Sequence, residues 1–167
     1  MNGTSEEVDR VVVRELTPKD LDAVVDLDEK VGGRRRNEYF RLKLQQALAE
    51  TGIKVSLAAE LDGRFAGFGL ARVFYGEFGA VEKVAVLDTF GVHPDLQGQG
   101  VARALLRQLR TNLLGLGIRR LQTEVAWQDA PLLAFFQHAG SDPPPRLALD
   151  LDLEAGRRRE ETADAPL

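Results

Sequence analysis

The residues best suited to chemistry form a glycine-rich loop, Gln97-Gly98-Gln99-Gly100-Val101-Ala102. An apolar run that predicts a strand precedes this loop, and an amphipathic pattern that predicts a helix follows it. Backbone N–H groups at the start of a helix bind anions, most often phosphate, and glycine lets a ligand approach the backbone closely. The loop therefore predicts a phosphate-binding site.

Two common phosphate-binding patterns do not fit this loop. A Walker loop requires Gly-Lys-Ser/Thr, which the sequence lacks. The dinucleotide fingerprint Gly-x-Gly-x-x-Gly fails because Arg103 stands where the third glycine is needed. A third pattern, Gln/Arg-x-x-Gly-x-Gly/Ala, matches residues 97–102 in full.

With its flanking residues, the loop resembles the acetyl-CoA-binding segment of the GNAT acetyltransferase superfamily. The run from Phe90 to Leu106 contains a strand, Val92-x-Pro94, the loop, and Leu105-Leu106 within the helix. The resemblance covers residues 11–153 and implies a GNAT-type N-acetyltransferase, an acyltransferase enzyme with acetyl-CoA as cosubstrate and no metal. It implies that the coenzyme diphosphate lies on the loop amides and that the pantetheine arm pairs with the strand. The implied coenzyme-binding residues are Phe90, Gly91, Val92, Gln97, Gly98, Gln99, Gly100, Val101, Ala102, Arg103, Asp129 and Phe136.

The second half of the family pattern departs from its usual residues. Asp129 stands in the place of an Asn, Phe136 in the place of a Tyr, and Gly140-Ser141 in the place of Gly-Phe. In relatives the Tyr protonates the departing thiolate of coenzyme A. Because Phe136 has no proton to donate, the resemblance leaves the general acid open, and Phe136 is expected to contact the coenzyme.

Two carboxylates are candidates for the catalytic base. N-acetylation requires a neutral amine, so a positioned group must accept a proton, directly or through water. Glu124 interrupts an apolar strand over residues 121–125 and lies five residues before Asp129. In the resembling family, relatives that acetylate N-terminal alanines carry a catalytic Glu at this distance from the equivalent position. A solvent-facing position explains Glu124 equally well. Asp88 is in phase with Phe90, so it either lines the same cleft or supports a bulge.

The acceptor is a small-molecule or peptide amine whose identity the sequence leaves open. The three adjacent arginines Arg34–Arg36 lie between two predicted helices that often form the acceptor wall in this superfamily. They either form a solvated linker, which is the favoured interpretation, or meet an anionic acceptor group. Homodimer formation and the use of an acyl group other than acetyl also stay open.

The main hypothesis is direct attack of the amine on the thioester in a ternary complex, because no Cys or Ser/His/Asp arrangement supports an acyl-enzyme. The alternative is a non-catalytic coenzyme-A-binding sensor or partner-binding relative, which Phe136 and Ser141 favour. A nucleotide-binding protein of another fold remains only if the loop match is fortuitous.

The elements that must position these residues follow from periodicity and turn signals. Their order predicts an α/β (α+β) fold, with a mixed, mostly antiparallel sheet flanked by about four helices and splayed at the coenzyme-binding strand. The predicted strands cover 8–14, 54–61, 64–74, 84–92, 119–127 and 147–153, and the predicted helices cover 17–31, 37–50, 101–116 and 131–138.

Composition excludes several other classes of function. The chain has 167 residues, no Cys, two His and a formal net charge of -4. These values argue against disulfides, a multi-histidine metal site and a dedicated nucleic-acid binder. No apolar run is long enough for a membrane helix, and the N-terminus has no signal-like apolar region, so we expect a cytoplasmic protein. We expect one domain over 1–153 and a charged, disordered tail over 154–167.

Overall fold

A computed structural model describes residues 10–49, 55–75, 79 and 81–154. The chain divides into two compact units, one ending at Glu124 and the other beginning at Val125. The predicted tail lies outside the described residues from position 155 onward, so its boundary stays a prediction.

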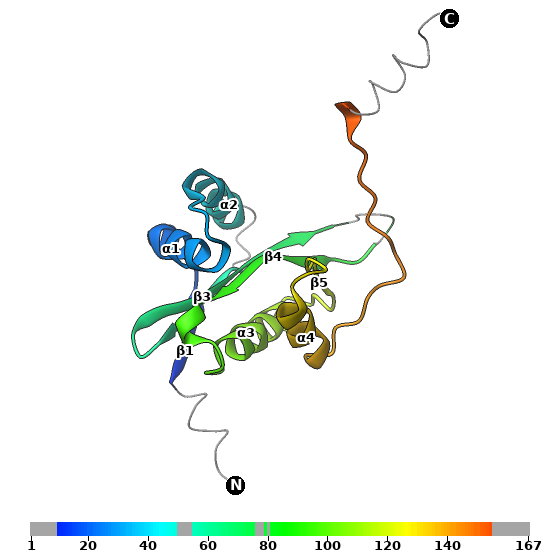
Figure 1. Ribbon diagram of the computed structural model, residues 1–167. Helices are drawn as coiled ribbons and strands as arrows, with labels where there is room; N and C mark the ends of the chain where they lie inside the picture. Colours follow the sequence, from blue (N-terminus) through cyan, green and yellow to red (C-terminus); the bar gives the residue numbers. More distant parts are fainter. Residues whose placement is uncertain (1–9, 50–54, 76–78, 80, 155–167) are drawn as a thin grey trace, which may run out of the picture. The chain divides into compact units, whose positions relative to one another are not determined.

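The first unit is built on one five-stranded sheet with the strands in sequence order (Figure 1). Neighbouring strands are antiparallel except for the last pair, which is parallel. This mixed, mostly antiparallel sheet confirms the predicted fold class. The strands are β1 (Val11–Glu15), β2 (Leu57–Leu61), β3 (Arg64–Phe74), β4 (Val84–Val92) and β5 (Leu121–Thr123).

Helices cover both faces of the sheet. Helices α1 (Leu21–Gly32) and α2 (Asn37–Ala49) lie on one face, and α3 (Val101–Gly115) lies on the other (Figure 1). On the first face, Phe40 of α2 meets Phe68 of β3 edge to face, with ring centroids 5.9 Å apart. On the second face, Leu105 and Leu109 of α3 are buried against the sheet. Each helix buries the apolar side that its spacing predicts.

Local signals in the sequence explain where several elements begin and turn. Asp62 and Gly63 join β2 to β3 with φ angles of +50° and +75°, as a two-residue hairpin turn requires. Before α1, the carboxylate of Asp20 accepts hydrogen bonds from the backbone N–H of Thr17 at 2.8 Å and from Arg14 at 2.8 and 2.9 Å. These contacts fix the connection from β1 into the first helix.

The second unit contains α4 (Ala130–His138), close to the predicted helix. Asp129 caps this helix, because its carboxylate accepts a hydrogen bond from the backbone N–H of Leu132 at 3.1 Å. Phe136 is the buried residue of the helix and meets Phe135 edge to face.

Two predicted strands are wrong: one is shorter than predicted and the other is absent. The strand expected over 119–127 is only three residues long, because its pairing with β4 ends at Thr123. The strand expected over 147–153 is absent, and its four leucines are 75–88% exposed. Alternating leucines become a strand only when a neighbouring strand supplies hydrogen bonds, and no described strand pairs with this segment.

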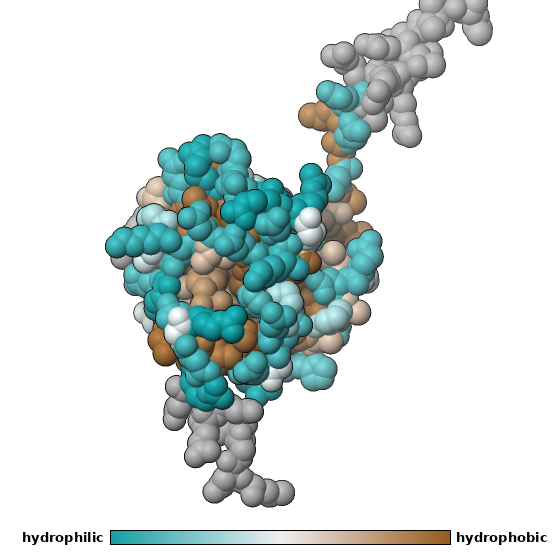
Figure 2. Space-filling view, turned by 60° about the vertical axis from the view of Figure 1, so that its left-hand side comes forward, coloured by the Kyte–Doolittle hydropathy of each residue, from teal (hydrophilic) through white to brown (hydrophobic). Residues whose placement is uncertain are grey.

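The surface is mainly hydrophilic, with a smaller apolar area among polar side chains on the face shown in Figure 2. In the part of the chain that the structure describes, no helix is both long and apolar enough to cross a membrane.

Candidate functional site

The glycine-rich loop leaves the start of α3 open to a ligand. Gly98 and Gly100 have φ angles of +76° and +84°, and a Cβ atom built on either would meet nothing within 4 Å. Gly100 is the N-cap residue of α3 and supplies no capping side chain. The first hydrogen bond within the helix runs from the N–H of Ala104 to the carbonyl of Gly100 at 2.9 Å. The amides of residues 101–103 therefore keep their hydrogen-bonding capacity for an anion.

Buried residues hold the loop in position. His93 is only 7% exposed, and its backbone N–H donates to the carbonyl of Ala66 on β3 at 2.8 Å. Its Nε2 lies 3.0 Å from Nζ of Lys30 on α1, and its Nδ1 accepts a hydrogen bond from the N–H of Asp95. The sequence alone does not reveal this role of His93, because a single histidine next to a turn carries no such signal.

One edge of β4 is unpaired beyond its midpoint. Strand β4 pairs with β3 as far as Val92, but its pairing with β5 ends at Leu87 and Thr123. At this point the hydroxyl of Thr123 donates a hydrogen bond to the carbonyl of Leu87 at 2.9 Å. Among the described strands, none continues the ladder beside residues 88–92 on that side. An extended ligand can pair with such an edge as an added strand.

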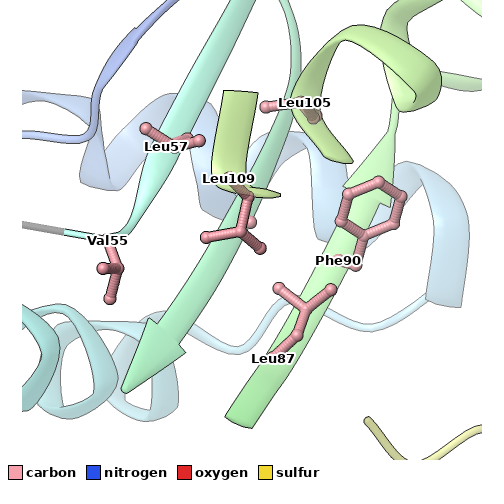
Figure 3. A pocket seen from close by; sticks show the side chains of 7 residues that line it. Val55, Leu57, Leu87, Phe90, Leu105 and Leu109 are labelled. Carbon is pink, nitrogen blue, oxygen red and sulfur yellow. The ribbon is translucent and has the colours of Figure 1, made fainter. Parts of the chain in front are cut away.

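A β-bulge at Asp88 changes which face each residue of β4 occupies. Leu70 pairs with Thr89 and Ala71 with Leu87, so Asp88 is the extra residue. Leu87 and Phe90 consequently lie on the same face, where they line a narrow apolar gap beneath α3 (Figure 3). The gap is too small to hold a water molecule.

The bulge corrects one sequence-based argument. Asp88 forms an ion pair with Lys43 of α2 at 2.6 Å, and α2 covers the opposite face from Phe90. The expectation that Asp88 is in phase with Phe90 is therefore wrong, because simple alternation does not cross a bulge. The alternative expectation was a bulge capped by Asp88 with Thr89, and the bulge is present, although the Asp88 side chain pairs with Lys43.

Glu124 directly follows the last paired residue of β5. It does not interrupt a strand over 121–125, since β5 ends at Thr123. In the parallel register Leu87 lies beside Thr123, so the next positions along the two strands are Asp88 and Glu124. Glu124 is exposed and has no ion pair or side-chain hydrogen bond within the described residues, whereas Asp88 is already paired with Lys43. The two candidate bases thus flank the point where the strands part.

The other predicted coenzyme-binding residues divide between exposed and structural positions. Gln97, Gly98 and Arg103 are exposed, whereas Val101 is buried. Gly91 has a packing reason for its identity, because a Cβ there would lie 3.1 Å from Leu27 and 3.3 Å from Phe68. Asp129 and Phe136 belong to the second unit, as a helix cap and a buried core residue, and their contact with the coenzyme stays a prediction.

The arginine run between α1 and α2 is largely bound within the protein. Arg35 forms ion pairs with Asp26 at 2.6 Å and Glu29 at 2.9 Å. Arg36 forms an ion pair with Asp28 at 2.6 Å, and hydrogen bonding to that carboxylate raises the pKa of Arg36. These contacts support the interpretation of the run as a helix-linking segment. Within the described ranges, no cluster of three or more His, Cys, Asp or Glu side chains could hold a metal ion.

Comparisons with known proteins agree with this geometry. The profile of the Acetyltransferase (GNAT) family matches residues 21–140. An aminoglycoside N(6')-acetyltransferase type 1 from Stenotrophomonas maltophilia is 28% identical over 137 residues, which cover 81% of this chain and 88% of that protein.

Solved structures show the same fold. The aminoglycoside N-acetyltransferase AAC(6')-Iy in complex with CoA superposes with a TM-score of 0.71 at 17% identity, covering 86% of this chain and 95% of that one. The ribosomal-protein-S18-alanine N-acetyltransferase from Escherichia coli gives a TM-score of 0.64 at 23% identity, covering 78% and 76%. With a family profile that matches well over half of its length, this chain belongs to the acetyltransferase (GNAT) family and is an acyltransferase.

Proposed function

We propose that this protein transfers an acetyl group from acetyl-CoA to a primary amine by direct attack in a ternary complex. The observation that carries the proposal is that two features occur together. The start of α3 is open and uncapped, and one edge of β4 has no neighbouring strand among the described strands. The first suits a diphosphate and the second suits an extended amide-containing chain. Coenzyme A carries both groups. The proposal also has support from the amine-acetylating enzymes named above, which share this fold.

The residues present fit the coenzyme. The loop from Gln97 to Gly100 and the amides of residues 101–103 would hold the diphosphate, because no side chain at Gly98 or Gly100 blocks their approach. The backbone of residues 88–92 would pair with the pantetheine arm. When bound, acetyl-CoA supplies a thioester, so the new C–N bond replaces the C–S bond.

Glu124 is the preferred base in this proposal. An amine in water is mostly protonated at neutral pH, so a carboxylate near the parting of β4 and β5 must remove a proton. Glu124 is exposed and has no ion-pair partner among the described residues. The carboxylate of Asp88 is already engaged by Lys43 at 2.6 Å, so it is not free to contact an amine. Asp88 therefore serves as the second candidate.

Substitution of Glu124 by Gln tests this assignment. The change keeps size and hydrogen bonding but removes basicity, so kcat should fall about 100- to 10,000-fold. The affinity for acetyl-CoA should stay the same, because the carboxylate is not a phosphate ligand.

Release of the coenzyme A thiol over a panel of primary amines gives the rate, and calorimetry gives the affinity. Glu38→Gln, at an exposed glutamate on α2 that pairs with Arg41, is the control and should keep parental activity. Near-parental kcat in Glu124→Gln would pass the role of base to Asp88, which Asp88→Asn then tests. Coenzyme A binding without transfer to any amine in the panel would favour the non-catalytic sensor.

A further inference from the structure

One arginine on β3 is only partly exposed and has no anionic partner among the described residues. Of the arginines in the described ranges, only Arg14 and Arg72 are not exposed. Arg14 is held by the carboxylates of Asp20 and Glu60, each at 2.8 Å. The Arg72 side chain has no hydrogen bond or ion pair to the described residues, and its Nε is buried without an acceptor. Buried polar groups of this kind are normally satisfied, so Arg72 stands out.

The sheet register places Arg72 on the sheet face covered by α1 and α2, which also carries the candidate base Asp88. Strand β3 is regular from Leu70 to Arg72, and Leu70 belongs to the core beneath α1 and α2, so Arg72 occupies the same face. Arg72 lies beside Val86 of β4, and Val86 lies beside Gln122 of β5. Asp88 and Glu124 each lie two positions further along those two strands. With strands about 4.8 Å apart and a rise of about 3.3 Å per residue, the Cα atoms of Arg72 and Glu124 are about 12 Å apart.

An aromatic ring restrains the Arg72 side chain. The guanidinium carbon of Arg72 lies 5.3 Å from the ring centroid of Phe74, two residues further along β3. Such stacking limits the freedom of the side chain, so less entropy is lost when the guanidinium binds an anion. Nearby, Asp88 does not neutralise Arg72, because Asp88 is paired with Lys43. The face therefore holds a restrained positive charge without a counter-ion from the described residues.

We propose that Arg72 binds a carboxylate of the acceptor, so that the acceptor is a primary amine that also carries a carboxylate. A planar guanidinium matches a carboxylate with two parallel hydrogen bonds. A polycationic acceptor would instead place a like charge beside Arg72. This inference rests on the proposed acetyl transfer and adds the acceptor class to it.

The first test compares matched acceptors with the parent protein. The probes are glycine, β-alanine, 4-aminobutyrate and 6-aminohexanoate, each beside its primary amide, and kanamycin as a polycation. A pentapeptide with an acidic second residue, beside its neutral counterpart, tests whether the carboxylate comes from a peptide rather than a free acid. We expect kcat/KM at least tenfold higher for the best carboxylate than for its amide. Equal rates for acids and amides throughout, or kanamycin as the best acceptor, would overturn the inference.

The second test removes the charge from Arg72. Arg72→Met keeps the length and apolar packing of the side chain, so the preference for the carboxylate over its amide should fall about 10- to 100-fold. Rates with the amide should change little. Arg72→Lys keeps the positive charge but lacks the planar guanidinium that donates two parallel hydrogen bonds, so it should retain part of the preference. Arg64→Met, an exposed arginine at the other end of β3, is the control and should keep the full preference. An unchanged preference in folded Arg72→Met would refute the assignment.

Binding measurements separate this inference from the proposed function. Calorimetry measures the affinity of each probe for the protein loaded with coenzyme A, without any need for transfer. If a carboxylate probe binds the parent but not Arg72→Met and no acetyl group is transferred, the inference stands and the proposed activity fails. If amines are acetylated without preference for a carboxylate, the activity stands and the inference fails. If Arg72→Met does not fold, the comparison of acids with amides and the Arg72→Lys variant decide the question.

Discussion

Substitution of Gly100 by Glu should weaken coenzyme A binding by about 30-fold or more and preserve the fold. The φ angle of +84° costs a side chain with a Cβ about 1–2 kcal/mol, and the surrounding space adds no clash. A negative charge at the start of α3 returns about 0.3–1 kcal/mol through the helix dipole. The net loss of stability is thus about 1 kcal/mol, or a fall in Tm of about 2–4 °C for a domain of this size.

The same charge should weaken coenzyme A binding strongly. Two unit charges 4 Å apart repel by about 1 kcal/mol even with the full dielectric constant of water, and by about 4 kcal/mol near a protein surface. A coenzyme diphosphate carries two charges, so the loss is about 2 kcal/mol or more, which corresponds to about 30-fold in Kd.

Gly33 offers a matched control for this substitution. It has a φ angle of +70° and equally open surroundings, but it lies at the C-terminal end of α1. Gly33→Glu therefore adds the same strain and charge, and the helix dipole makes it slightly more destabilising. Thermal unfolding should show that Gly33→Glu is the less stable of the two variants. Calorimetry should show that Gly33→Glu keeps its affinity for coenzyme A while Gly100→Glu loses affinity. Binding by Gly100→Glu within threefold of the parent would refute the assignment of the loop.

Two further predictions concern stability. Burial acts to raise the pKa of Asp20, but hydrogen bonds from Arg14 and Thr17 outweigh it and hold that pKa below its ordinary value. The stabilisation by the Asp20 carboxylate is therefore complete above about pH 4 and is lost as the pH falls through the lowered pKa. Asp20→Asn should lower the free energy of unfolding by about 2–3 kcal/mol at pH 7. Urea unfolding of this variant should also depend less on pH in the acid range. In Gly67→Ala the new Cβ would lie 2.9 Å from the Gly91 carbonyl and 3.0 Å from Val101. Urea unfolding should therefore show a loss of stability of about 1–3 kcal/mol. The control Gly69→Ala, with contacts no shorter than 3.4 Å, should lose less than half as much stability.

The sequence predicted the elements whose signals are local. The amphipathic period of α3, the Asp62-Gly63 turn and the glycines before Val101 each specify backbone geometry within a few residues. These signals were sufficient for the order of the elements from β1 to α4, the fold class and the open loop.

Features that depend on distant residues could not be predicted in the same way. The bulge at Asp88 exists because β3 and β4 pair in two registers, and neither strand alone shows it. The end of β5 at Thr123 likewise depends on its pairing with β4 rather than on its own apolar run. The ion pair of Lys43 with Asp88 and the unpaired state of Arg72 arise from packing between elements, so the sequence analysis did not single out either cation.

The unpaired edge of β4 also has a consequence for how the protein behaves in solution. Exposed strand edges are templates for pairing with another chain, and proteins usually protect them with charges, prolines or covering segments. Of residues 88–92 on this edge, only Asp88 carries a charge, and none is a proline. A ligand that occupies the edge therefore also shields it, so the protein should resist self-association during purification and storage better with coenzyme A in the buffer than without it.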